Sequence, residues 1–148
     1  MASCRWLSMS EGPLDRRPPG VNQATVDAVG KLSGALETVE EARGHLYAFH
    51  RLTGTADFGV EEAADMLAEA GHEHLAERLR AELIGRNVIS QRWTFQIVED
   101  YDDGYYATIR ELEATVRNEL MDGNRHVREA ELKAQRRTPG REGHEAAP

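Results

Sequence analysis

Two polar residues on one face of a predicted helix are the first candidates for chemistry in this chain of 148 residues. Arg43 and His50 fall on the line of an apolar helical face centred on Leu32, because 32, 43 and 50 are separated by nearly whole helical turns. Tyr47 lies at the edge of the same face. Charged groups on a packed face are costly unless they are paired, so we expect acidic partners for Arg43 and His50.

A second segment places an acid on an apolar face, which is formed by Val98, Ile109 and Val116. Asp102 lies inside that face, and Glu99 and Tyr106 flank it. If the helix predicted for 22–53 runs up and the helix that carries Asp102 runs down, Arg43 and Asp102 meet at one level. That level lies about 15 Å below the upper end of the first helix. We therefore expect Arg43 and Asp102 to be largely buried and to form an ion pair.

This ion pair has two interpretations: it fixes the packing of a helical bundle, or it belongs to a ligand pocket. The segment 92–106 favours a pocket, since it holds five of the nine aromatic residues together with four acids. Aromatic rings beside carboxylates suit cationic ligands, but Tyr and Trp are also enriched at protein interfaces. The candidate ligand-binding residues are Arg43, Tyr47, His50, Trp93, Glu99, Asp102 and Tyr106.

No catalytic motif is assembled in the sequence. A ferritin-like di-iron centre needs two inward-facing Glu-x-x-His motifs, and the helical region has one match, Glu69 to His72, across a predicted helix break. Phosphate-binding glycine loops and Gly-x-Ser-x-Gly elbows are absent. We assign no catalytic residue, metal ligand or cofactor, which favours a non-enzymatic protein. A single metal held by His50, Glu99 and Asp102 remains the alternative arrangement.

The composition limits the partners and the compartment. The net charge is −8, and residues 21–123 carry −11 between mildly basic ends, which argues against nucleic acid as a partner. No apolar run approaches the ~20 residues that span a bilayer, so we expect no membrane association. One cysteine, Cys4, excludes an intramolecular disulfide, and the first ten residues lack the apolar core of a secretory signal. We expect an acidic, soluble, cytoplasmic protein.

The apolar spacing of three and four residues predicts helices throughout the middle of the chain. The predicted helices cover 22–53, 60–70, 72–84 and a stretch from 87–91 to about Met121, with a charged helical continuation over 125–137. The predicted fold is all-α, an antiparallel four-helix up-and-down bundle with two long and two short helices. Residues 1–20 are predicted to be a disordered leader, 21–137 the helical bundle domain and 138–148 a disordered tail. Met1 and Met9 are both possible starts.

The unequal helix lengths predict assembly. The short helices span about 16 and 20 Å against about 50 Å for the long ones, so part of the long pair lacks cover. A twofold homodimer would supply the missing walls through residues such as Val116. Alternatively, the leader or the 125–137 helix folds back over this surface.

The stretches ARGHLYAFHRLTGTADF (42–58) and GRNVISQRWTFQIVEDYDDGYY (85–106) resemble an uncharacterised family of small helical proteins from high-GC bacteria, with no assigned activity. The resemblance covers about 21–137 and implies no functional residue. Our first hypothesis is a non-enzymatic helical protein that acts through protein–protein interaction or homo-oligomerisation. The alternative is a bundle that binds a small molecule or metal around Arg43, His50, Glu99 and Asp102.

Overall fold

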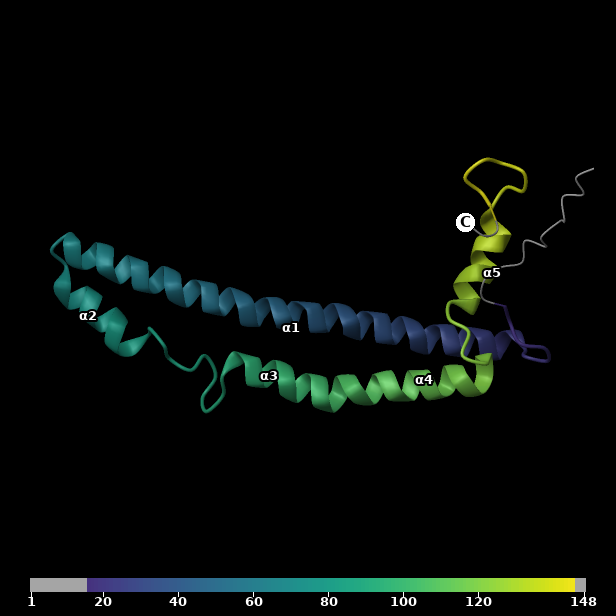
Figure 1. Ribbon diagram of the computed structural model, residues 1–148, viewed down its shortest axis with the longest axis horizontal. Coiled ribbons are helices and arrows are strands. Elements are labelled where there is room, and N and C mark those ends of the chain that lie inside the picture. The colour runs from purple at the N-terminus through teal and green to yellow at the C-terminus, as the bar shows by residue number, and fades with distance from the viewer. Residues whose placement is uncertain (1–15, 146–148) are drawn as a thin grey trace, which may run out of the picture. The chain divides into compact units, whose positions relative to one another are not determined.

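A computed structural model describes residues 16–145, and the described part is all-α, as predicted, without a β-strand. Its elements are α1 (Gln23–Glu69), α2 (Glu73–Glu82), α3 (Thr94–Tyr101), the π-helical turn η1 (Asp102–Tyr106), α4 (Ala107–Met121) and α5 (Val127–Arg136) (Figure 1). The predicted disorder of residues 1–15 and 146–148, the choice of start and Cys4 lie outside the described residues.

The predicted end of the first helix at Gly54 is wrong, because α1 continues through Gly54 to Glu69. The stretch 60–70, predicted as a separate short helix, is almost entirely the C-terminal part of α1. A glycine in a helix interior costs only about 1 kcal/mol, whereas a helix end leaves several backbone groups to be satisfied elsewhere. α1 ends instead just before Gly71, whose φ of 88° is a left-handed conformation that glycine adopts readily.

The chain divides into two compact units, and α1 and α4 contribute residues to both. Unit 1 comprises residues 16–36 and 110–145 of the described range, and unit 2 comprises residues 37–109.

The core of unit 1 is formed by Val26, Val29, Met121 and Val127. Val127 belongs to α5, so the 125–137 segment covers this end of the long helices, which was one of the predicted alternatives. Val116 is partly buried and packs against this core. Both carboxylate oxygens of Glu131 accept hydrogen bonds from Arg17, at 2.7 Å each, which attaches residues of the predicted leader to α5.

The segment at the end of the chain that was predicted to be disordered contains turns where it is described, over residues 138–145. In these turns the Thr138 N–H donates to His144 Nδ1 at 3.1 Å.

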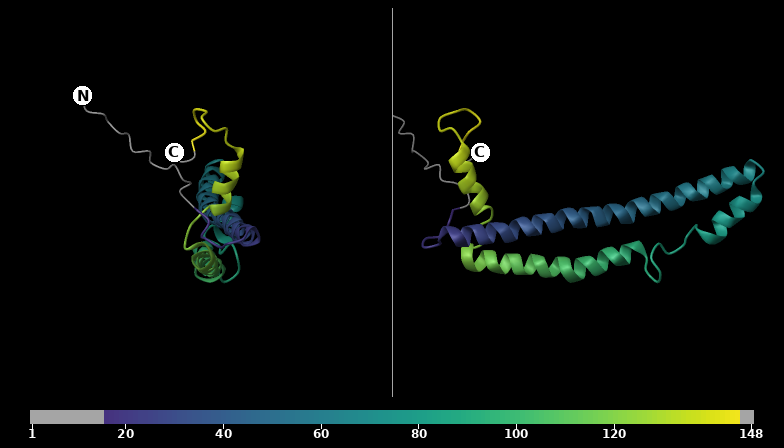
Figure 2. Two further views of the ribbon diagram at one scale, coloured as in Figure 1. Left: turned by 90° about the vertical axis from the view of Figure 1, so that its right-hand side faces the viewer. Right: turned by 180° about the vertical axis from the view of Figure 1, so that it is seen from behind.

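Unit 2 packs α1 against α2 and α3, which follow one another along the same side of the helix (Figures 1 and 2). The inward-facing positions of α1 in this unit alternate at spacings of three and four residues, which is a heptad repeat. They are Val39, Arg43, Leu46, His50, Thr53, Asp57, Val60, Ala64 and Leu67. Ala64 and Ala76 are buried where α1 and α2 approach each other. One chain therefore supplies two antiparallel layers of helix in unit 2.

Candidate functional site

The predicted ion pair between Arg43 and Asp102 is present in unit 2. Arg43 donates from Nε and Nη2 to the two carboxylate oxygens of Asp102, each at 2.7 Å. This hydrogen-bonded guanidinium lowers the pKa of Asp102, and the carboxylate in turn raises the pKa of Arg43. The two side chains are 32% and 28% exposed, so both are largely buried, as predicted, but not fully. α1 has only one layer of helix beside it here, which leaves the pair partly in contact with water.

Tyr106 completes this cluster. The guanidinium carbon of Arg43 lies 5.2 Å from the centre of the Tyr106 ring, and the Tyr106 hydroxyl donates to the carboxylate of Glu40 at 2.7–2.8 Å. Asp102 and Tyr106 are the first and last residues of η1, and π-helical turns are frequent at functional sites. Asp102 and the Tyr106 ring are the groups suited to a cationic ligand, and the guanidinium of Arg43 contacts both of them.

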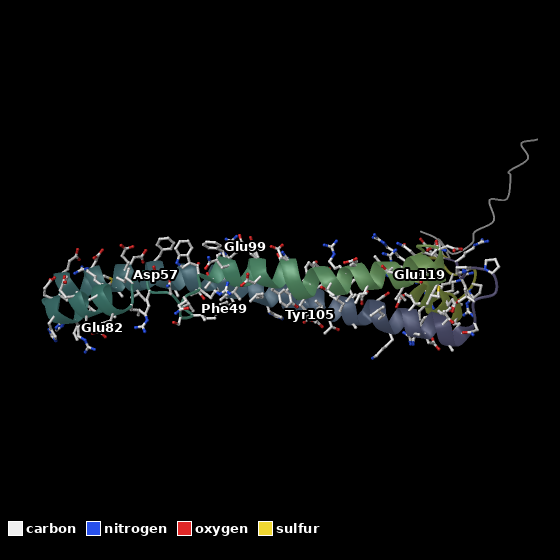
Figure 3. All side chains as sticks on the ribbon, turned by 90° about the horizontal axis from the view of Figure 1, so that it is seen from below. Phe49, Asp57, Glu82, Glu99, Tyr105 and Glu119 are labelled. Carbon is white, nitrogen blue, oxygen red and sulfur yellow. The ribbon has the colours of Figure 1, made fainter. Side chains whose placement is uncertain are left out.

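His50 does not have the acidic partner that was predicted. Its Nδ1 lies 2.8 Å from the hydroxyl of Thr94 at the start of α3, and the Tyr47 ring meets the imidazole edge-on at 6.0 Å between ring centres. Glu99 is exposed and lies on the opposite edge of unit 2 from Phe49 (Figure 3). A neutral hydroxyl therefore takes the place that was predicted for a carboxylate.

A third polar contact was missed by the sequence analysis. Asp57 accepts a hydrogen bond from the backbone N–H of Gly85 at 3.0 Å. Arg43, His50 and Asp57 are thus spaced by seven residues, and each contacts the returning part of the chain. The signal was present in the sequence as this constant spacing, but the predicted helix end at Gly54 separated Asp57 from the other two.

Trp93 belongs to a different part of unit 2, an open groove of about 660 Å³. The groove lies between α1, the 83–93 connection and the start of α3, and its lining includes Val60, Leu83, Val88, Trp93 and Phe95. Asp57 and Arg86 are the charged residues in the lining. Of the seven predicted ligand-binding residues, only Trp93 lines this groove. The structure thus brings together Arg43, Asp102 and Tyr106, and separately Tyr47 and His50.

Within residues 16–145, no group of three or more His, Cys, Asp or Glu side chains is arranged to hold a metal ion. His50, Glu99 and Asp102 therefore do not form a metal-binding group. No helix in the described part of the chain is long and apolar enough to cross a membrane. Comparison with protein-family models, curated proteins and solved structures finds no match.

Unit 2 also exposes many apolar side chains, which the helical spacing in the sequence did not predict. Twelve large apolar or aromatic side chains in this unit are each at least two-fifths exposed. They are Tyr47, Phe49, Leu52, Phe58, Met66, Leu75, Leu83, Val88, Ile89, Trp93, Phe95 and Tyr105. Among the described residues of unit 1, three are comparably exposed: Leu112, Leu120 and Leu132.

Proposed function

We propose that the protein acts through protein–protein contacts, first of all with a second copy of itself, and that it is not an enzyme. The observation that carries this proposal is the exposed apolar surface of unit 2. At roughly 100 Å² for each of the twelve side chains, the exposed large apolar surface of unit 2 adds up to about 1,200 Å². Contiguous exposed apolar patches above about 600 Å² are typical of sites of association.

The same proposal accounts for the predicted four-helix arrangement. One copy of unit 2 supplies two antiparallel layers, so two copies joined through their apolar surfaces supply four antiparallel layers. Twofold symmetry is the commonest way to close such an assembly.

In this proposal the predicted site residues are positioning residues. Arg43 with Asp102, and His50 with Thr94, fix how α1 lies against α3, and thereby determine which apolar side chains remain on the outside. Polar contacts of this kind select one alignment among helices whose apolar positions repeat.

Sedimentation equilibrium of the full chain tests the proposal. We expect a dimer at micromolar concentration that dissociates only on strong dilution. Native mass spectrometry of the same sample should give twice the chain mass of 16.5 kDa and no further bound mass. A monomer throughout the micromolar range would refute the proposal, because the exposed surface would then have no partner among copies of the chain.

Small-molecule binding is the second candidate function, and the groove favours it. Its volume of about 660 Å³ is within the range of ligand pockets, and Asp57 and the Trp93 ring offer a carboxylate and a π face to an organic cation. Benzyltrimethylammonium is a suitable probe, followed by the indole N–H resonance of Trp93. Binding that weakens in Asp57→Asn would support this function, and an unmoved resonance at millimolar probe would exclude it.

A further inference from the structure

α1 carries a second apolar stripe in unit 2, next to the one that packs against α2 and α3. Its positions again alternate by three and four residues, and every one of them is exposed. They are Ala42, His45, Phe49, Leu52, Ala56, Gly59, Ala63 and Met66, and Ala70 directly after the helix continues the series. We call these nine positions the outer stripe.

The outer stripe has the properties of a helix–helix contact surface. It contains no Asp, Glu, Lys or Arg, although charged residues make up 30% of the chain. Helices that present apolar residues on two adjoining stripes are normally packed between two neighbours. In unit 2, α2 and α3 supply the neighbour for the inner stripe only. The outer stripe therefore requires a second helical partner.

We propose that the outer stripe pairs with the outer stripe of a second copy, antiparallel, about a twofold axis at Ala56. This inference rests on the proposed self-association and specifies its surface. Under this symmetry two large side chains of one half lie opposite small residues of the other half. Phe49 faces Ala63, and Leu52 lies within one residue of the level of Gly59.

The remaining pairs bring together residues of like size: Met66 faces His45, Ala42 faces Ala70, and Ala56 faces itself. A parallel pair would place Phe49 against Phe49 and Gly59 against Gly59, with crowding at the first level and a void at the second. Both defects are destabilising, and the antiparallel pair avoids them at these two levels.

The available area and charge agree with a self-pair. Counting roughly 100 Å² for each large side chain and about 50–70 Å² for each small one, the outer stripe offers about 700 Å², close to the ~800 Å² per partner of a specific interface. No like charges meet within the stripe when two copies are related by the twofold axis, because the stripe has no Asp, Glu, Lys or Arg. Tyr105 of η1 lies on the same edge of unit 2 as Phe49, which extends the apolar edge onto the returning helix (Figure 3).

Cysteine cross-linking tests the proposed alignment. In a Cys4→Ser background, Ala56→Cys should give a disulfide-linked dimer on mild oxidation, because residue 56 lies on the twofold axis and small side chains permit the Cα separation of about 4.4–6.8 Å. Ala42→Cys alone should stay unlinked, since its two copies lie about 40 Å apart in the antiparallel pair. A mixture of Ala42→Cys and Ala70→Cys should give the linked heterodimer.

A pair of charge substitutions tests the surface without cross-linking. Leu52 and Phe58 are 67% and 68% exposed, but only Leu52 belongs to the outer stripe. Leu52→Glu should raise the dimer dissociation constant at least ~100-fold, because the twofold axis introduces the buried charge twice. Phe58→Glu is the matched control and should change it less than ~5-fold. Circular dichroism checks that both variants remain helical.

The outcomes separate this inference from the proposed function. A dimer in which Ala56→Cys stays unlinked, or in which Phe58→Glu dissociates and Leu52→Glu does not, overturns the outer-stripe pairing and leaves self-association standing. Self-linking of Ala42→Cys shows a parallel pair and overturns the twofold axis at Ala56. An unmodified chain that sediments as a monomer overturns both proposals.

Discussion

A charged side chain is buried in unit 1, and we predict that its ion pair is sensitive to substitution. Glu113 is 6% exposed, and its Oε1 accepts hydrogen bonds from Ser33 Oγ at 2.9 Å and from Arg117 Nε at 3.2 Å. Arg117 also donates to the carbonyl of Gly123 at 2.9 Å, in the turn that follows α4. The variant Arg117→Met keeps the aliphatic packing and leaves a buried carboxylate with one neutral partner.

The expected cost of Arg117→Met is about 3 kcal/mol of the free energy of unfolding, because a buried charge loses its counter-ion. Ser33→Ala should cost about 1 kcal/mol, the net value of one hydrogen bond. Adding Glu113→Leu to Arg117→Met should recover most of the loss, since an apolar pair of similar volume then replaces the broken ion pair. Urea denaturation followed by circular dichroism at constant protein concentration measures all of these values.

Arg78→Met is the matched control for this prediction. Arg78 and Glu82 have the same i,i+4 spacing as the unit 1 pair, reversed in order along the helix, but their side chains are 69% and 60% exposed. This substitution should leave the unfolding midpoint unchanged within error. Should Arg117→Met be tolerated as well as Arg78→Met, burial of Glu113 would not be the cause of its sensitivity, and the reasoning would be refuted.

Further predictions concern other parts of the chain. Gly54→Ala should stabilise the protein by about 0.5–1 kcal/mol in urea denaturation, because α1 runs through this position and nothing lies within 4 Å of the added Cβ. Since hydrogen bonding to Arg43 lowers the pKa of Asp102 below its ordinary 3.8, this carboxylate stabilises the fold above about pH 4, and its contribution is lost as the pH falls through the lowered pKa. Asp102→Asn should therefore make the melting temperature fall less between about pH 5 and 3 than it does in the unmodified chain. Met121→Ala should cost about 2–5 kcal/mol in thermal unfolding, because Met121 is fully buried in the unit 1 core.

The Arg43–Asp102 ion pair could be predicted from helical phase together with the level of each residue along its helix. Both residues sit on apolar faces, and a charge on such a face needs a partner. The levels matched because α3 returns antiparallel to α1, although the path between them differs from the predicted one. The predicted short helices 60–70 and 72–84 were both given the wrong direction along the bundle, and the two errors cancel. The Arg43–Asp102 pairing is therefore predicted correctly, although the connection between the two helices is not.

Other features could not be read from the sequence in this way. The predicted end of the first helix depended on Gly54, but one glycine destabilises a helix too weakly to end it, and α1 continues to Glu69. His50 was given an acid because burial was assumed, whereas a half-buried imidazole is satisfied by the hydroxyl of Thr94. The π-helical turn at 102–106 adds one residue to a helical turn, and no residue type encodes that reliably.

The seven-residue spacing of Arg43, His50 and Asp57 has a consequence for misfolding. If α1 slid by one heptad along the returning chain, most apolar side chains would meet equivalent neighbours, so hydrophobic packing alone would tolerate the slip. The polar contacts would not, because His50 would then face Asp102 and Arg43 would face the region of the aliphatic Ile109. The three residues contact three different partners, a carboxylate, a hydroxyl and a backbone N–H, and these contacts fix the alignment of α1 with the returning chain. The chain closes in one alignment out of several that its apolar repeat would accept.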